Sequence, residues 1–148
     1  MKINFTKKEY RKLVELLYLG DWMLHSHDVQ ANPETRAHRE LRDKIFAQAG
    51  QMGCENIIAR HAGGYFETRE FEDFMQGYVQ NYDNQTFWQE LIARLAERDA
   101  TRQAKAQGNE SMDRDELFDL IDAAEQRWGE ELAQHALERI AIVPDRQI

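Results

Sequence analysis

The spacing of apolar residues along the chain predicts a protein built almost entirely from helices. The clearest example is a run of large apolar side chains after Thr68, at Phe71, Phe74, Met75, Tyr78, Val79 and Tyr82. This is the i, i+3, i+4, i+7, i+8 spacing of one helical face. The N-terminal segment has a helix start signal as well, because Glu9 follows Thr6 at the spacing of a capping box. No segment alternates apolar and polar residues as a half-buried strand does.

Helix boundaries follow from these patterns and from a small number of breaking residues. Pro33 follows Asn32 at a position that suits a first helical turn, and Gly63 and Gly64 are predicted to close a short helix. The predicted helices cover residues 7–26, 33–52, 54–62, 68–82, 85–107 and 113–143. We therefore expect an all-α fold, a single domain over residues 1–148, arranged as an irregular bundle of about six helices with no β-sheet. Its predicted core includes Phe74, Tyr78, Leu91, Leu95, Leu120 and Ile121.

Composition narrows the classes of protein to which this chain belongs. Of its 148 residues, 42% are hydrophobic and 31% are charged, which is typical of a globular domain. The net charge of −8 opposes binding to a phosphate backbone, so no nucleic-acid partner is expected. The longest apolar-rich stretch, from Leu13 to Leu24, is too short and too interrupted to span a membrane. With one cysteine and no leader-like N-terminus, a cytoplasmic location is expected.

A few residues have sequence surroundings that suit chemistry. Asp21 shares a predicted apolar stripe, and His25 lies one turn further along, so the two are candidates for a pocket beside the first helix, together with His61 and His135. Cys54 is a candidate nucleophile because it is placed at a predicted helix N-terminus. Asp21 is otherwise a structural ion pair or a residue exposed at a groove edge, and His25 part of a polar helix C-terminus whose histidines complement the dipole. His135 is otherwise a satisfied core histidine, and Cys54 an inert packed thiol.

Motifs for metal or cofactor binding are missing from the sequence. The Glu-x-x-His motif of helical metal proteins and the HExxH motif of zinc proteases do not occur, so we predict neither a metal nor a cofactor. Serine occurs only at Ser26 and Ser111, and neither lies in a nucleophile elbow. The sequence therefore favours a protein that is not an enzyme. An enzyme, or a binder of a metal or small molecule, that uses the pocket beside the first helix is the alternative.

The distribution of charge points to a protein partner. Asp115, Asp119 and Asp122 lie along one side of the last predicted helix, which is either a solvated face or a surface for a basic partner. The basic N-terminal segment, with Lys2, Lys7, Lys8, Arg11 and Lys12, is a possible counterpart. Trp22 and Trp128 are the predicted apolar contacts, since exposed ion pairs contribute little energy. We expect a protein that acts through protein–protein contacts, either as a homodimer or with a different partner.

Overall fold

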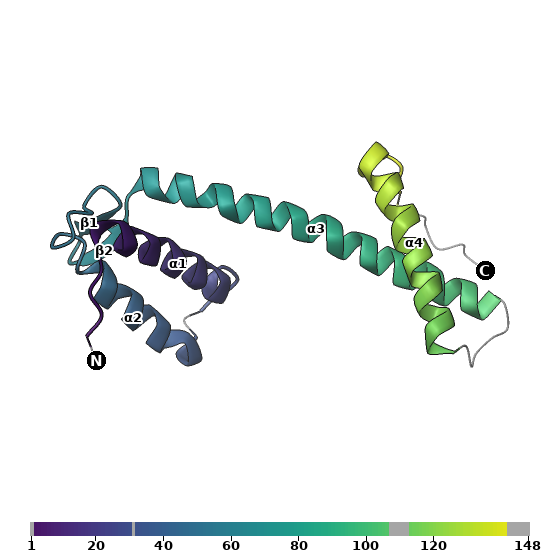
Figure 1. Ribbon diagram of the computed structural model, residues 1–148, viewed down its shortest axis with the longest axis horizontal. Coiled ribbons are helices and arrows are strands. Elements are labelled where there is room, and N and C mark those ends of the chain that lie inside the picture. Colours follow the sequence, from purple (N-terminus) through teal and green to yellow (C-terminus); the bar gives the residue numbers. More distant parts are fainter. Residues whose placement is uncertain (1, 31, 107–112, 142–148) are drawn as a thin grey trace. The chain divides into compact units, whose positions relative to one another are not determined.

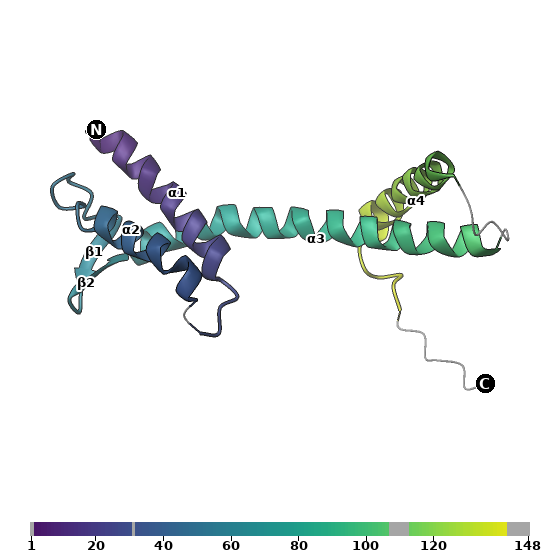
Figure 2. The ribbon, with the colours of Figure 1, turned by 90° about the horizontal axis from the view of Figure 1, so that it is seen from below.

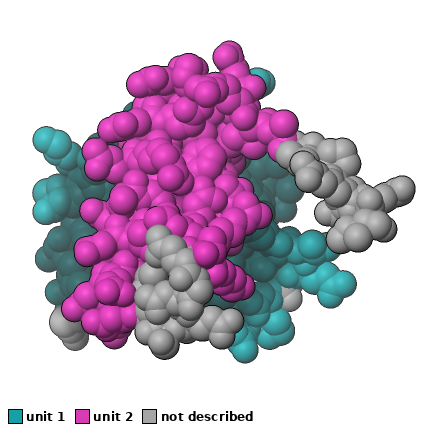
Figure 3. All heavy atoms as spheres, turned by 90° about the vertical axis from the view of Figure 1, so that its right-hand side faces the viewer, with its two compact units in different colours: residues 1–82 teal, residues 83–148 magenta. Residues whose placement is uncertain are grey.

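The computed structural model of this chain describes residues 2–30, 32–106 and 113–141. Its elements are α1 (Lys7–His25), a 3₁₀ turn η1 (Pro33–Thr35), α2 (Arg36–Phe46), β1 (Ile58–His61), β2 (Gly64–Glu67), α3 (Arg69–Ala106) and α4 (Arg114–His135) (Figure 1). The described part of the chain is thus mostly helical, with four α-helices and a two-stranded hairpin. The prediction of six helices without a sheet is wrong in both details. The chain divides into two compact units, residues 1–82 and residues 83–148 (Figure 3).

Helix α1 begins where its capping box predicts. The Thr6 backbone N–H donates to Glu9 Oε2 at 2.8 Å, and the Glu9 N–H donates to Thr6 Oγ1 at 3.3 Å. Two N–H groups that the helix itself leaves without partners are satisfied in this way. The helix ends at His25, one residue earlier than predicted.

The prediction of a helix over residues 54–62 is wrong, because residues 58–61 form the first strand of a β-hairpin. Strands β1 and β2 pair antiparallel, with Ile58 opposite Glu67 and His61 opposite Gly64. The two turn residues, Ala62 and Gly63, both have positive φ, 48° and 83°. Turns of this kind match the right-handed twist of paired strands. Gly63 therefore lies in the turn that reverses the chain, and Gly64 begins β2 instead of closing a helix.

Three further differences from the predicted helices concern their boundaries. The helices predicted over residues 68–82 and 85–107 are one continuous helix, α3, because residues 83–86 contain neither glycine nor proline to interrupt it. The helix predicted over residues 33–52 starts as a 3₁₀ turn and ends at Phe46. The last helix ends at His135 rather than at 143, where Ala136 takes a φ of 48° that a right-handed helix does not accommodate; residues 142 and 143 lie outside the described part.

Unit 1 has a well-formed apolar core between α1, α2, the hairpin and the start of α3. Helices α1 and α2 lie side by side, and the hairpin lies near the end of α2 (Figures 1 and 2). The buried cluster contains Tyr10, Val14, Tyr18, Phe46, Ala49, Cys54, Ile57, Ile58, Phe71, Met75 and Val79. Helix α3 contributes positions 71, 75 and 79 to this core, so its neighbours Phe74 and Tyr78 are 48% and 53% exposed. The prediction that these two residues are core is wrong.

Unit 2 consists of the second part of α3 and of α4, which crosses it (Figure 1). Its buried apolar side chains among the described residues are few and mostly small: Ala96, Ala100, Ala124 and Leu132. Small side chains at a crossing let two helices approach closely. The predicted core residues Leu91, Leu95, Leu120 and Ile121 are only half-buried. Across the described residues, no helix has the length and apolarity needed to cross a membrane.

Candidate functional site

The structure brings the first sequence candidate, Asp21, into a polar cluster between α1 and α2. Arg42 Nη1 donates to Asp21 Oδ2 at 2.6 Å, and Arg39 Nε lies 4.0 Å from Oδ1. The side chains of Asp21 and Arg42 are 21% and 18% exposed, so their charges are largely removed from water. Opposite charges at this distance compensate each other, which is the structural ion pair that the sequence offered as one interpretation.

His25 is fixed within the same cluster through both ring nitrogens. Nδ1 lies 3.0 Å from the Asp21 backbone oxygen and also 3.0 Å from its carboxylate Oδ1, and Nε2 lies 2.8 Å from Thr35 Oγ1. Its side chain is 5% exposed. These contacts join the end of α1 to η1 through His25.

A polar pocket of about 330 Å³ opens beside this cluster. It is lined by Tyr18, Asp21, Trp22, His25 and Ser26 from α1 and its end, Arg39 and Arg42 from α2, and Glu67, Glu72 and Gln76. Burial raises the pKa of Glu67, and the negative charges of Asp21 and Glu72 act in the same direction, against its own backbone hydrogen bond and Arg42. The pocket therefore holds one carboxylate that is costly to ionise. The hydroxyl that contacts His25 Nε2 belongs to Thr35, which is not among the residues that line this pocket.

The remaining candidates do not meet at this pocket. Cys54 is buried at 2% exposure in the turns before β1, with Sγ 3.6 Å from the Met52 carbonyl oxygen. His61 is exposed at the end of β1. The helix predicted to carry both Cys54 and His61 does not form. His135 is the half-buried last residue of α4. Within the described ranges, no three His, Cys, Asp or Glu side chains are placed to hold a metal ion.

Unit 2 presents a different kind of surface, which is apolar and incompletely covered. We give the name helix-pair edges to the half-buried or exposed large apolar side chains of α3 and α4 in this unit: Phe87, Trp88, Leu91, Ile92, Leu95, Leu117, Phe118, Leu120, Ile121 and Trp128. Phe87 and Phe118 are 49% and 55% exposed. A depression of about 270 Å³ lies between the helices, lined by Trp88, Ile92, Gly129, Leu132 and Ala133.

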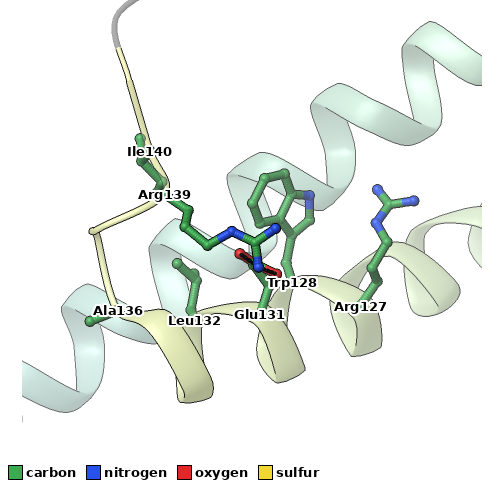
Figure 4. Close-up of a pocket in the computed structure, with 7 residues that line it drawn as sticks. All are labelled: Arg127, Trp128, Glu131, Leu132, Ala136, Arg139 and Ile140. Atoms are coloured by element: carbon green, nitrogen blue, oxygen red, sulfur yellow. Dashed lines mark hydrogen bonds and ion pairs between the residues drawn. The ribbon is translucent and has the colours of Figure 1, made fainter.

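A second depression, of about 230 Å³, lies around the end of α4 (Figure 4). Trp128, Leu132 and Ile140 supply its apolar wall, and Arg139 folds back to Glu131 with Nη1 at 3.1 Å from Oε1. Arg127, the third charged residue of the lining, pairs with Asp99 at 2.9 Å, so this depression has both apolar and charged walls.

Trp128 is held in place by polar contacts from α3. Its Nε1 donates to Asp99 Oδ2 at 2.9 Å, and the Arg98 guanidinium lies 5.7 Å from the ring centroid. Burial would raise the pKa of Asp99, but hydrogen bonds from Arg98 and Trp128 outweigh it and lower that pKa. Trp22, the other tryptophan predicted to make contacts, is half-buried against the unit 1 core.

The sequence did not single out Arg39, Arg42, Thr35 or Asp99 as partners of these residues. Asp21 and Arg42 are 21 positions apart, and Asp99 and Trp128 are 29 positions apart. No local spacing rule connects residues on different helices. The only available signal was that a carboxylate in an apolar stripe needs a cation or a hydrogen-bond donor.

Comparisons of the chain with known protein families, with curated proteins and with solved structures find no match.

Proposed function

We propose that this protein acts through contact with another protein chain, and that the helix-pair edges of unit 2 are the contact surface. The observation that carries this proposal is the contrast in burial between the two units. Unit 1 buries large side chains such as Phe46, Ile57 and Met75, whereas three of the four buried apolar residues named in unit 2 are alanines.

A pair of helices cannot bury all of the apolar surface that this sequence carries. Each helix has one face toward the other, and any apolar residue beside that face stays partly in water. Helical domains cover such residues with a third or fourth helix. Leu91 and Leu95 on α3, and Leu120 and Ile121 on α4, are half-buried residues of this kind.

Covering these residues would contribute favourably to association. Burying apolar surface yields roughly 25 cal/mol per Å², or about 1.5–3 kcal/mol for a large side chain that moves from full exposure to full burial. A contiguous apolar surface on a folded protein is a common feature of contact sites. The polar pocket of unit 1 is the weaker candidate for a functional site, because Asp21 and His25 are occupied in joining α1 to α2 and η1.

Site-specific photocrosslinking in living cells tests this proposal. A photoreactive phenylalanine analogue in place of Phe118 is expected to give a covalent adduct with a second protein chain. The matched control places the same analogue at Val29, which is 97% exposed and lies in a loop of unit 1. If exposure alone governed the reaction, Val29 would react more readily than Phe118. Adducts from Val29 and none from Phe118 would contradict the proposal.

A further inference from the structure

We infer that the polar pocket of unit 1 binds a small organic cation through a primary ammonium group, which lies among Glu67, Glu72 and Gln76, and that the rest of this ligand carries no second positive charge. The pocket is separate from the helix-pair edges, so the inference goes beyond the proposed function. The three residues named also differ from Asp21 and His25 in that they do not join α1 to α2 and η1.

The two cations of the pocket, Arg39 and Arg42, have counter-ions of their own. Arg42 Nη1 lies 2.6 Å from Asp21 Oδ2, and Arg42 Nη2 lies 3.0 Å from Asp43 Oδ1. Arg39 Nε lies 4.0 Å from Asp21 Oδ1. Asp21 and Asp43 therefore supply the ion pairs of both guanidinium groups.

The other carboxylates that line the pocket are Glu67, at the end of β2, and Glu72, in the first turn of α3. Within residues 2–30, 32–106 and 113–141, neither belongs to an ion pair. Glu67 is half-buried, and burial is the largest cause of its raised pKa. A half-buried carboxylate is stabilised in its charged form by a cation or by hydrogen-bond donors, and an ammonium group supplies both.

The ligand set of this wall suits an ammonium group better than a metal ion. Among the described residues, no three His, Cys, Asp or Glu side chains are placed to hold a metal. Gln76 follows Glu72 by one helical turn, so the two share a side of α3. Its Nε2 donates to the Tyr18 hydroxyl at 2.8 Å, and its Oε1 is an acceptor. A primary ammonium group has three N–H donors, one for each of Glu67, Glu72 and Gln76.

The remainder of the pocket limits what else the ligand carries. The Arg39 side chain is 40% exposed, so a second positive group that entered this pocket would be repelled by it. Trp22 is half-buried and also lines the pocket, whose volume is about 330 Å³. Its indole offers an apolar contact. A short apolar chain on the ammonium group therefore fits the pocket, and a second ammonium group does not.

NMR titration of the isotope-labelled full chain with three amines tests this inference. We expect butylamine to shift the amide signals of Glu67, Glu72 and Gln76. Putrescine should bind roughly fivefold more weakly, because Arg39 and Arg42 repel its second charge. Butyltrimethylammonium has the same charge as butylamine but no N–H donor, and it should bind roughly tenfold more weakly.

The order of the three probes separates the pocket from general attraction to an acidic protein. Because the net charge is −8, general attraction would favour putrescine over butylamine and would not depend on N–H donors. Putrescine or butyltrimethylammonium that binds as tightly as butylamine would overturn the inference. Butylamine that leaves the signals of Glu67, Glu72 and Gln76 in place would overturn it as well.

Matched variants connect the binding to Glu67. Glu67→Gln keeps the length of the side chain and removes its charge, so butylamine should bind roughly tenfold more weakly. Glu70→Gln removes the charge of an exposed residue that does not line the pocket, and it should leave the affinity unchanged. Equal affinities of the two variants would contradict the site. Since removal of a buried charge should stabilise the fold, weaker binding by Glu67→Gln would not reflect unfolding. Photocrosslinking at Phe118 is independent of these titrations, so either proposal can fail alone.

Discussion

Arg42 donates a hydrogen bond to the carboxylate of Asp21 at 2.6 Å, and this contact joins α2 to the C-terminal part of α1. A second hydrogen bond joins the same two helices, because the Tyr10 hydroxyl donates to the Ile45 carbonyl oxygen at 2.8 Å. Unit 1 is therefore held by a compact apolar core and by polar contacts at its edge. The contacts explain why a carboxylate occurs in an otherwise apolar helix stripe.

The Asp21–Arg42 pair is expected to contribute measurably to stability. Asp21→Ala removes the less exposed of the two carboxylates that contact the Arg42 guanidinium, which is 18% exposed, and leaves only the exposed Asp43 at 3.0 Å. We expect a loss of about 2 kcal/mol in the free energy of unfolding. The matched control is Glu40→Ala, which breaks an ion pair with Arg36 whose side chains are 62% and 78% exposed. That change should cost less than about 0.5 kcal/mol. Urea denaturation measures both, and equal losses would show that the buried position of Asp21 has no effect.

Adjacent residues on α3 should differ sharply in their contribution to the core. Met75 is 1% exposed, so Met75→Ala is expected to cost about 2–5 kcal/mol. Phe74 is 48% exposed, and Phe74→Ala should cost less than about 1 kcal/mol although it removes the larger side chain. A greater loss from Phe74 than from Met75 would mean that the opposite side of α3 faces the core.

The pH dependence of stability should report on Glu67. Because burial raises its pKa in the folded protein above the ordinary value of 4.5, the folded state holds this proton to higher pH than the unfolded state does. The contribution of Glu67 to stability is therefore present at low pH and is lost as the pH rises through its raised pKa. Glu67→Gln should increase the melting temperature at pH 7 and remove this part of the pH dependence. Glu70→Gln, at an exposed position in the first turn of α3, should change neither.

Cys54 should behave as a packed side chain rather than as a nucleophile. Its thiol is 2% exposed, so a thiol reagent should label the native protein slowly and the protein in guanidinium chloride at once. Cys54→Ser places a hydroxyl in the apolar cluster and should cost about 1–3 kcal/mol. Rapid and complete labelling under native conditions would contradict the burial of this residue.

Local signals in the sequence were sufficient for the helices that carry them. The Thr6–Glu9 capping box predicted the start of α1, and Asp113 predicted the start of α4, where its side chain accepts a hydrogen bond from the Arg114 N–H at 2.7 Å. Helix ends were predicted less well. The chain leaves α4 at Ala136 through a positive φ, and alanine carries no signal for that conformation.

The hairpin was missed because its strands are too short to show alternation. Ile58–His61 and Gly64–Glu67 have four residues each, and Ile58 is the only β-branched residue among them. The fold explains the glycine at position 64, since a Cβ atom there would lie 2.7 Å from the Phe66 ring. That contact exists only in the folded hairpin, so the sequence alone does not show it. The polar partners of Asp21 and Trp128 were missed for a related reason, since tertiary contacts between helices bring them together.

Tertiary packing also explains why two helices were predicted in place of the continuous α3. Its apolar pattern changes side between the two units, with Phe71, Met75 and Val79 in the core of unit 1 and Ala96 and Ala100 buried in unit 2. A change of side looks like a break when helices are recognised by one apolar face. The backbone has no reason to break there, because side-chain burial and helix continuity are independent properties.

We propose that the half-buried and exposed apolar side chains of α3 and α4 in unit 2 contact another protein chain. Hydrogen–deuterium exchange at several protein concentrations tests this surface most directly for a second copy of the chain, with unit 1 as the internal control. We predict that the amides of residues 91–105 and 115–132 become more slowly exchanging as concentration rises, because association adds to the stability of unit 2. The amides of α1, in unit 1, should exchange at the same rate throughout. Leu91→Lys should remove the concentration dependence in unit 2, and Val29→Lys should leave it unchanged. Exchange in unit 2 that is slow and independent of concentration in the wild-type protein would contradict the claim.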